Sequence, residues 1–153
     1  MRSSTHRGVI ASYTHPGSQL GVLIELQCES EIVARTPEFQ DLAHDLAMQV
    51  AATNPRFIRR DEVTDEVLAT ERTRIHALAL NDGKPETAAE KITTACMSTF
   101  HAQVCLHEQS FIKDGSVTVG GLLRSLSAEL GETISVARFV RLKLGEISGS
   151  EEP

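Results

Sequence analysis

The chain has 153 residues, of which 41% are hydrophobic and 24% are charged, and its formal net charge is −6. This length and composition are typical of one folded domain with a hydrophobic core. The negative charge argues against direct nucleic-acid binding, because a groove for phosphates needs clustered Lys and Arg. The sequence has no apolar stretch long enough for a membrane span and no apolar segment behind its basic N-terminus, so we expect neither a membrane anchor nor a secretory signal.

Two β-strands are expected near the N-terminus. The segments Gly8–His15 and Leu20–Gln27 are rich in β-branched and aliphatic residues. Pro16-Gly17-Ser18 lies between them and has the composition of a turn, because proline presets φ and glycine tolerates positive φ. The pattern predicts a β-hairpin.

Four helices are expected in the middle of the chain. The first is predicted to begin at Thr36-Pro37-Glu38, with Thr36 as N-cap, and to end at Asn54-Pro55. Helical spacing of its apolar residues predicts one broad face for packing. The other signals are a start at Thr64 and a stop at Asn81-Asp82-Gly83, a start at Pro85, a turn at Asp114-Gly115, a start at Thr118 and a stop at Gly131.

The last expected element is a strand over Ile134–Leu144. Its apolar residues share one parity, with Arg138 as the exception, so they are predicted to lie on the same face: Ile134, Val136, Val140, Leu142 and Leu144. The order of elements predicts an α+β fold, with a three-stranded antiparallel sheet and about four helices packed on it. Residues 8–146 are expected to form this domain, and residues 1–7 and 147–153 to be flexible.

The sequence carries no motif typical of an enzyme: G-x-S-x-G, a P-loop, a dinucleotide fingerprint and H-E-x-x-H are all missing. We therefore predict neither catalysis nor a cofactor. The cysteines are three in number and form no C-x-x-C pair, so they are expected to be unpaired and free of metal. His101, Cys105 and His107 are conceivable zinc ligands, but their spacing matches no standard tetrahedral site.

The stretch CESEIVAR, residues 28–35, lies at the junction between the second strand and the first long helix. Val33 is expected to join the core, with Glu29 and Arg35 in solvent. Glu31 and Ile32 are expected at the tip of the junction. Two interpretations of Ile32 are open from the residues alone: it packs inward, as apolar residues at element ends often do, or it faces a partner.

Several motifs in this order are those of a known family. They are GVIASYTH, LGVLIELQCESEIVARTPEFQDLAHDLAMQVAATNPRF, ALNDGKP with AEKI, EQSFIKD with TVGGLL, and VARFVRLKLGE. Together they resemble the core of bacterial elongation factor Ts from about Gly8 to Glu146. The resemblance implies a nucleotide-exchange factor that binds the GTPase elongation factor Tu and releases GDP without covalent chemistry. It also implies a homodimer, because short family members with a single core pair up, and a bacterial cytoplasmic location, with mitochondrion or plastid as alternatives.

The resemblance also implies where the partner binds. The family reads roughly C-E-T-D-F-V-A-R where this chain has CESEIVAR, and its aromatic ring wedges into the GTPase. The implied partner-binding residues are Ser30, Glu31, Ile32 and Val33, with Gln49 as a second anchor. Isoleucine in place of the ring is expected to lose about 1–3 kcal/mol of contact, so a non-exchanging relative that acts as a scaffold is the alternative. The family usually begins with a small helical ubiquitin-associated-like domain, and this chain is expected to start after it.

Overall fold

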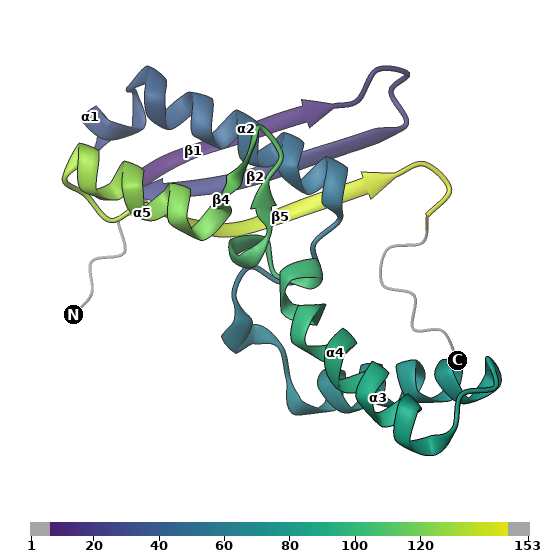
Figure 1. Ribbon diagram of the computed structural model, residues 1–153. Helices are drawn as coiled ribbons and strands as arrows, with labels where there is room; N and C mark the ends of the chain where they lie inside the picture. Colours follow the sequence, from purple (N-terminus) through teal and green to yellow (C-terminus); the bar gives the residue numbers. More distant parts are fainter. Residues whose placement is uncertain (1–6, 147–153) are drawn as a thin grey trace.

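The computed structural model describes residues 7–146, and its centre is a three-stranded antiparallel sheet (Figure 1). The strands are β1 (Arg7–Thr14), β2 (Leu20–Cys28) and β5 (Ser135–Lys143), in the order β1-β2-β5. Two long helices, α2 (Pro37–Thr53) and α5 (Val119–Leu130), lie over one face of the sheet (Figure 1). The predicted α+β class and all three predicted strands are confirmed. The predicted flexible ends, apart from Arg7 at the start of β1, lie outside the described residues.

The helix ends follow the capping residues that the sequence offers. The Thr36 hydroxyl accepts a hydrogen bond from the amide of Phe39, and the hydroxyls of Thr64 and Thr118 cap α3 (Asp65–Asn81) and α5 in the same way. Gly131 ends α5 with φ of 71°, a left-handed conformation that glycine adopts without strain. Pro85 precedes α4 (Glu86–Val104), as predicted.

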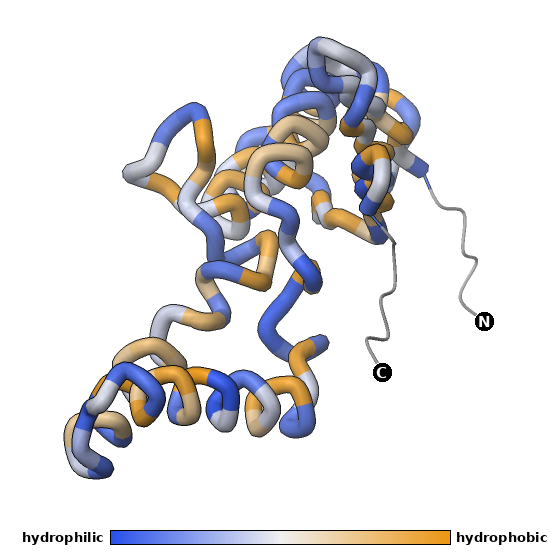
Figure 2. The backbone as a smooth tube through the Cα atoms, turned by 90° about the vertical axis from the view of Figure 1, so that its right-hand side faces the viewer, coloured by the Kyte–Doolittle hydropathy of each residue, from blue (hydrophilic) through white to orange (hydrophobic). Residues whose placement is uncertain are grey.

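Helices α3 and α4 form an antiparallel pair that projects away from the sheet layer (Figures 1 and 2). Short 3-10 turns join this pair to the rest of the chain: η1 (Arg60–Glu62) precedes it and η2 (Leu106–Glu108) follows it. A single parallel β-bridge between Phe57 and Cys105 ties its two connections together. The pair packs around its own small cluster of buried residues, separate from the main core: Val63, Phe100, Val104 and Cys105.

The main core lies between the sheet and the helices that cover it. Ile24 and Leu26 of β2 meet Phe39, Leu46 and Val50 of α2, and all of them are almost completely buried. Phe39, Leu46 and Val50 occupy the predicted apolar face of α2, so helical spacing correctly predicted which side of this helix packs against the sheet. None of the helices within residues 7–146 has the length and hydropathy needed to cross a bilayer.

Besides the two 3-10 turns, three short elements were not predicted: the one-turn helix α1 (Glu31–Ala34) and a small hairpin of β3 (Ser110–Phe111) and β4 (Asp114–Thr118). The predicted turn at Asp114-Gly115 is wrong by two residues. Phe111 pairs with Asp114, so the chain reverses at residues 112–113 and Asp114 already belongs to a strand. The composition of the Asp-Gly pair signalled a turn nearby, but cross-strand pairing determines where it closes.

The predicted single face of the last strand is also wrong. The pairing between β2 and β5 shifts between Glu25 and Leu26, where a β-bulge puts an extra residue, Ala137, into β5. An extra residue turns every later side chain to the opposite face. Val136 is therefore buried under the helices, whereas Val140 is 52% exposed on the other side of the sheet.

Candidate functional site

The junction after β2 forms an exposed tip, which we define as residues Ser30–Val33. Ser30 is the N-cap of α1, and its hydroxyl accepts a hydrogen bond from the amide of Val33 at 3.2 Å. Val33 is only 7% exposed and packs into the main core, as predicted. The side chain of Ile32 is 81% exposed, so the interpretation in which it packs inward is wrong. The side chain of Ile32 is therefore accessible to a partner.

The charged residues of the tip pair with each other. Glu31 accepts a hydrogen bond from Arg35 at 2.7 Å, one helical turn later, and both side chains are mostly exposed. An exposed pair of this kind contributes little to stability. Glu31 therefore remains available for a partner cation beside Ile32.

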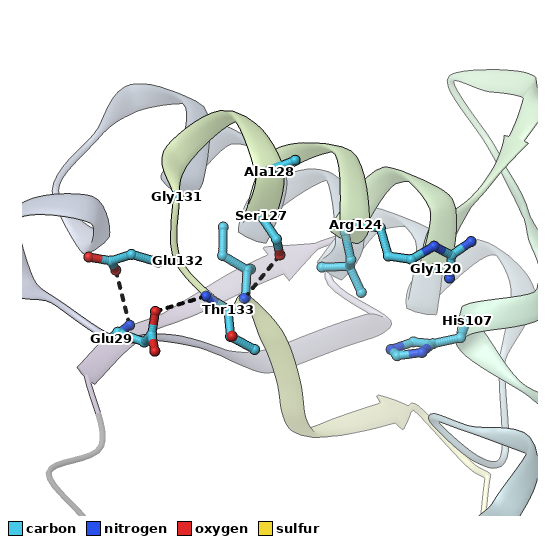
Figure 3. A pocket seen from close by; sticks show the side chains of 11 residues that line it. Glu29, His107, Gly120, Arg124, Ser127, Ala128, Gly131, Glu132 and Thr133 are labelled. Carbon is cyan, nitrogen blue, oxygen red and sulfur yellow. Dashed lines mark hydrogen bonds between the residues drawn. The ribbon is translucent and has the colours of Figure 1, made fainter.

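Two carboxylates fix the tip to the loop that leads into β5 (Figure 3). Glu132 Oε1 accepts hydrogen bonds from the amides of Glu29 and Ser30, at 3.1 and 2.9 Å. In return, Glu29 Oε2 accepts from the amide of Thr133 at 3.0 Å. The hydrogen bond with Ser30 holds the pKa of Glu132 below its usual value. The N-terminal end of the tip is thus held by hydrogen bonds, and its other end by the buried side chain of Val33.

We expect the hydrogen bonds from the amides of Glu29 and Ser30 to Glu132 to be lost at low pH. Because the pKa of Glu132 is lowered in the folded protein, its anchoring is complete above the usual glutamate pKa and disappears as the pH falls through the lower folded value. The amide resonances of Glu29 and Ser30 should therefore titrate together, below the usual glutamate pKa, in a series of ¹⁵N–¹H spectra. Glu132→Gln should abolish that titration; amides that titrate equally in this variant would contradict the role of Glu132.

Gln49, expected as a second anchor for a partner, is 0% exposed. Its side-chain NH₂ donates to Gln109 Oε1 and to the carbonyl oxygen of Ser110, both at 3.1 Å. Its Oε1 accepts from the amide of Ile112 at 2.8 Å. Gln49 is therefore a buried residue that links α2 to the β3–β4 hairpin, and it has no surface to offer a partner.

The structure brings together a different set of possible metal ligands from the one considered in the sequence. The side chains of His101, Cys105 and Glu108 lie close enough to share an ion, and His107 lies elsewhere. Burial, followed by the carboxylate of Glu108, raises the pKa of the Cys105 thiol to about 11. Without an ion, the thiol is therefore protonated at neutral pH, and a metal would have to displace that proton. All three cysteines are free thiols.

A cavity of about 510 Å³ lies beside the tip (Figure 3). Glu29 and Glu132 line it at the end near α1, and His107 and Arg124 line it near the start of α5. Sequence reasoning missed this cavity, since its walls come from three separate segments that only the fold brings together.

A family model described as elongation factor TS matches residues 1–146 of the chain.

The chain belongs to the elongation factor Ts family. It is 50% identical to elongation factor Ts of Solibacter usitatus over 148 residues, which cover 97% of this chain and 70% of that protein. It is 49% identical to elongation factor Ts of Moorella thermoacetica over 146 residues, covering 95% and 72%. For elongation factor Ts of Carboxydothermus hydrogenoformans the identity is 46% over 139 residues, covering 91% of this chain and 64% of that protein.

Membership in the elongation factor Ts family gives the exposed tip its context. Glu31 and Ile32 occupy the positions of the Asp-Phe pair in the family pattern described above. In the structure, those two positions are the exposed ones, whereas Val33 is buried. The tip is therefore the candidate contact site of this family member.

Proposed function

We propose that this chain binds the translational GTPase elongation factor Tu and promotes the release of GDP. The observation that carries the proposal is Ile32, which is 81% exposed on a tip that is held at its N-terminal end by hydrogen bonds and at its other end by the buried side chain of Val33. Family membership supports the same role. The proposal places the protein where translation elongation takes place, in the cytoplasm of a bacterium.

Exchange of this kind needs only differential binding. A protein that binds the nucleotide-free GTPase more tightly than the GDP-bound form shifts the GTPase towards nucleotide release, and equal affinity would shift nothing. The role assigned to Ile32 is to insert between elements of the GTPase that close on GDP, with Glu31 against a neighbouring cation. The fixed backbone of the tip matters because a preorganised contact loses less conformational entropy on binding.

The test uses the GTPase loaded with a fluorescent GDP. Addition of this chain should increase the GDP dissociation rate in a concentration-dependent manner that saturates. A chain that binds the GTPase, as measured by calorimetry, but leaves the dissociation rate unchanged would favour the non-exchanging scaffold. That alternative is worth testing because isoleucine is smaller than the aromatic residue of the family pattern.

We also propose that two copies pair through the open face of the sheet. All the helices that cover the sheet lie on the other side, and the open face carries exposed apolar side chains: Ile10, Leu23, Val140 and Leu142, which are between 52% and 65% exposed. An ion pair between Glu25 and Arg138, at 3.2 Å, lies among them and neutralises both charges. A face shared by two identical copies is self-complementary under two-fold symmetry, and such a large apolar surface is rarely left in water.

Val140→Asp is expected to convert the dimer to a monomer at micromolar concentration, as measured by light scattering. The two copies would each bring a charge into a face that excludes water, which costs several kcal/mol without a partner. Ala102→Asp, at an exposed position of α4, is the matched control and should remain dimeric. A wild-type chain that is already monomeric would rule out the proposed interface.

A further inference from the structure

Three side chains of different chemistry meet at the end of α4 that lies nearest the sheet layer (Figure 1). His101 lies in the last turn of α4, Cys105 is the C-cap residue of this helix, and Glu108 is the last residue of η2. One ring nitrogen of His101, the sulfur of Cys105 and a carboxylate oxygen of Glu108 all lie within 4.8 Å of one another. The i, i+4 spacing puts His101 and Cys105 on one face of the helix. The turn of η2 brings Glu108 back to them.

Hydrogen bonds within the chain account for two of these groups but not for the third. The Glu108 carboxylate pairs with the Arg60 guanidinium and accepts a hydrogen bond from the Cys105 thiol. His101 Nδ1, by contrast, is buried and has no hydrogen-bond partner within residues 7–146. A buried polar atom without a partner is unfavourable, and an imidazole can coordinate an ion through either of its nitrogens.

An ion can reach these groups from solvent. Cys105 is fully buried, but His101 is only half-buried, and the side chain of Glu108 is 29% exposed. The sulfur therefore forms the floor of the cluster, whereas the other two groups border the surface. A metal site needs such an entry path.

The donor set fits a zinc ion. Cysteine sulfur, imidazole nitrogen and carboxylate oxygen are the usual protein ligands of zinc, and three of them leave a fourth tetrahedral position for water. Bonds of about 2.0–2.3 Å place the ligand atoms about 3.5 Å apart around a tetrahedral ion, so small side-chain rotations would bring the three atoms to bonding distance. Magnesium and calcium prefer oxygen ligands and do not suit this set.

The charges around Cys105 favour a cation. Two carboxylates, those of Glu108 and Glu62, act on the thiol together with one guanidinium, that of Arg60. A carboxylate has about four lone-pair positions, so Glu108 can hold Arg60 and an ion at the same time. Coordination would release the thiol proton to solvent, and the resulting thiolate, with the carboxylate, would balance the two charges of zinc.

We propose that His101, Cys105 and Glu108 bind a zinc ion that fastens the base of the α3–α4 pair. The site differs from the one weighed in the sequence, because the fold brings Glu108 rather than His107 to the other two residues. It is independent of the proposed function.

The position of the ion explains what it would fasten. Both connections of the α3–α4 pair meet here, since the amide of Leu106 donates to the carbonyl oxygen of Phe57 at 2.8 Å. Arg60 of η1 also pairs with Glu108 of η2. The ion would link the last turn of α4 to η2 and, through Arg60, to η1.

The first test is calorimetry of zinc binding to the untagged chain, kept reduced and freed of metal with a chelator. We expect one zinc ion per chain with micromolar or tighter affinity, and no comparable binding of magnesium. Cobalt in place of zinc should show the charge-transfer absorption of a metal-bound thiolate, which only a cysteine ligand produces. A wild-type chain that binds no zinc, or cobalt without that absorption, would overturn the site.

Three variants assign the ligands: Cys105→Ser, His101→Gln and Glu108→Gln. Each should weaken zinc binding by at least about tenfold, since even the loss of a residue that only supports a ligand weakens metal binding by about 10–100-fold. Circular dichroism checks that each variant is folded. If Cys105→Ser does not fold, Glu108→Gln decides, because its side chain lies at the surface. Unchanged zinc binding by a folded ligand variant would refute the assignment.

Two variants on the same helix are matched controls. Cys96→Ser removes the exposed cysteine of α4, and Glu90→Gln alters a second group of possible ligands, formed with His76 and Glu86. Both should bind zinc as the wild type does. Zinc binding that is lost in Glu90→Gln but kept in Cys105→Ser would place the ion on the second group and overturn the proposal.

Hydrogen exchange tests the fastening role. If the α3–α4 pair must release the ion to open, the amides of Phe100 and Val104 should exchange about a hundredfold more slowly at a free zinc concentration of about one hundred times Kd. The amide of Leu46, in the main core, serves as the reference and should respond less. Equal exchange of Phe100 and Val104 with and without bound zinc would overturn this role.

Discussion

Replacing Ile32 by alanine is expected to reduce the acceleration of GDP release by about ten- to a hundredfold, which corresponds to a loss of about 1–3 kcal/mol of partner contact. The melting temperature should change little, because a side chain that is 81% exposed leaves no cavity when it is shortened. Fluorescent-GDP dissociation and thermal unfolding, measured on the same sample, test both halves of this expectation.

Two companion variants sharpen the result. Ile32→Phe should strengthen GTPase binding or speed GDP release, because the ring adds apolar area to the contact. Val33→Ala, one residue further on, removes a buried side chain and should lower stability by about 1–3 kcal/mol. If Ile32→Ala destabilised the protein as much as Val33→Ala, the side chain would be structural and the proposed contact would fail.

Gln49→Ala is expected to lower the free energy of unfolding by about 3 kcal/mol or more. The change removes a fully buried side chain and leaves polar groups of the neighbouring hairpin unpaired, among them the amide of Ile112 and the carbonyl oxygen of Ser110. Urea unfolding followed by circular dichroism measures the loss. At a temperature where the variant remains folded, its exchange activity should be close to that of the wild type.

Gln103→Ala is the matched control for Gln49→Ala, since it shortens the same type of side chain at an exposed position of α4 and should be nearly neutral. If Gln49→Ala retained wild-type stability but lost GTPase binding, the side chain would contact the partner after all, and its assignment to the core would be wrong.

Local signals in the sequence were sufficient for most of the fold. Thr36, Thr64 and Thr118 cap helices by hydrogen bonds that span three residues, so their effect is visible in a short window. The β-bulge that turns Val140 outward depends on pairing between β2 and β5, which lie more than a hundred residues apart. No local pattern reports such a shift, and this is why the single-face prediction failed.

In the candidate site, too, local features were predictable from the sequence and long-range contacts were not. The exposure of Ile32 follows from its position at a capped junction, and family resemblance pointed to that position. Gln49 lies on the predicted helix, but its partners Gln109 and Ile112 lie just before and within a hairpin about sixty residues later in the chain, so its burial could not be foreseen. The hydrogen bonds from the amides of Glu29 and Ser30 to Glu132, and the cavity beside them, also arise only from tertiary contacts.

The separate packing of the α3–α4 pair affects how the protein unfolds. Its apolar cluster does not merge with the core under the sheet, and the connection runs through two short segments bridged at Phe57 and Cys105. Structural units with separate cores can lose their order independently, at a lower free energy than global unfolding. The α3–α4 pair is therefore expected to unfold and refold locally while the sheet layer, with the tip at its edge, stays intact.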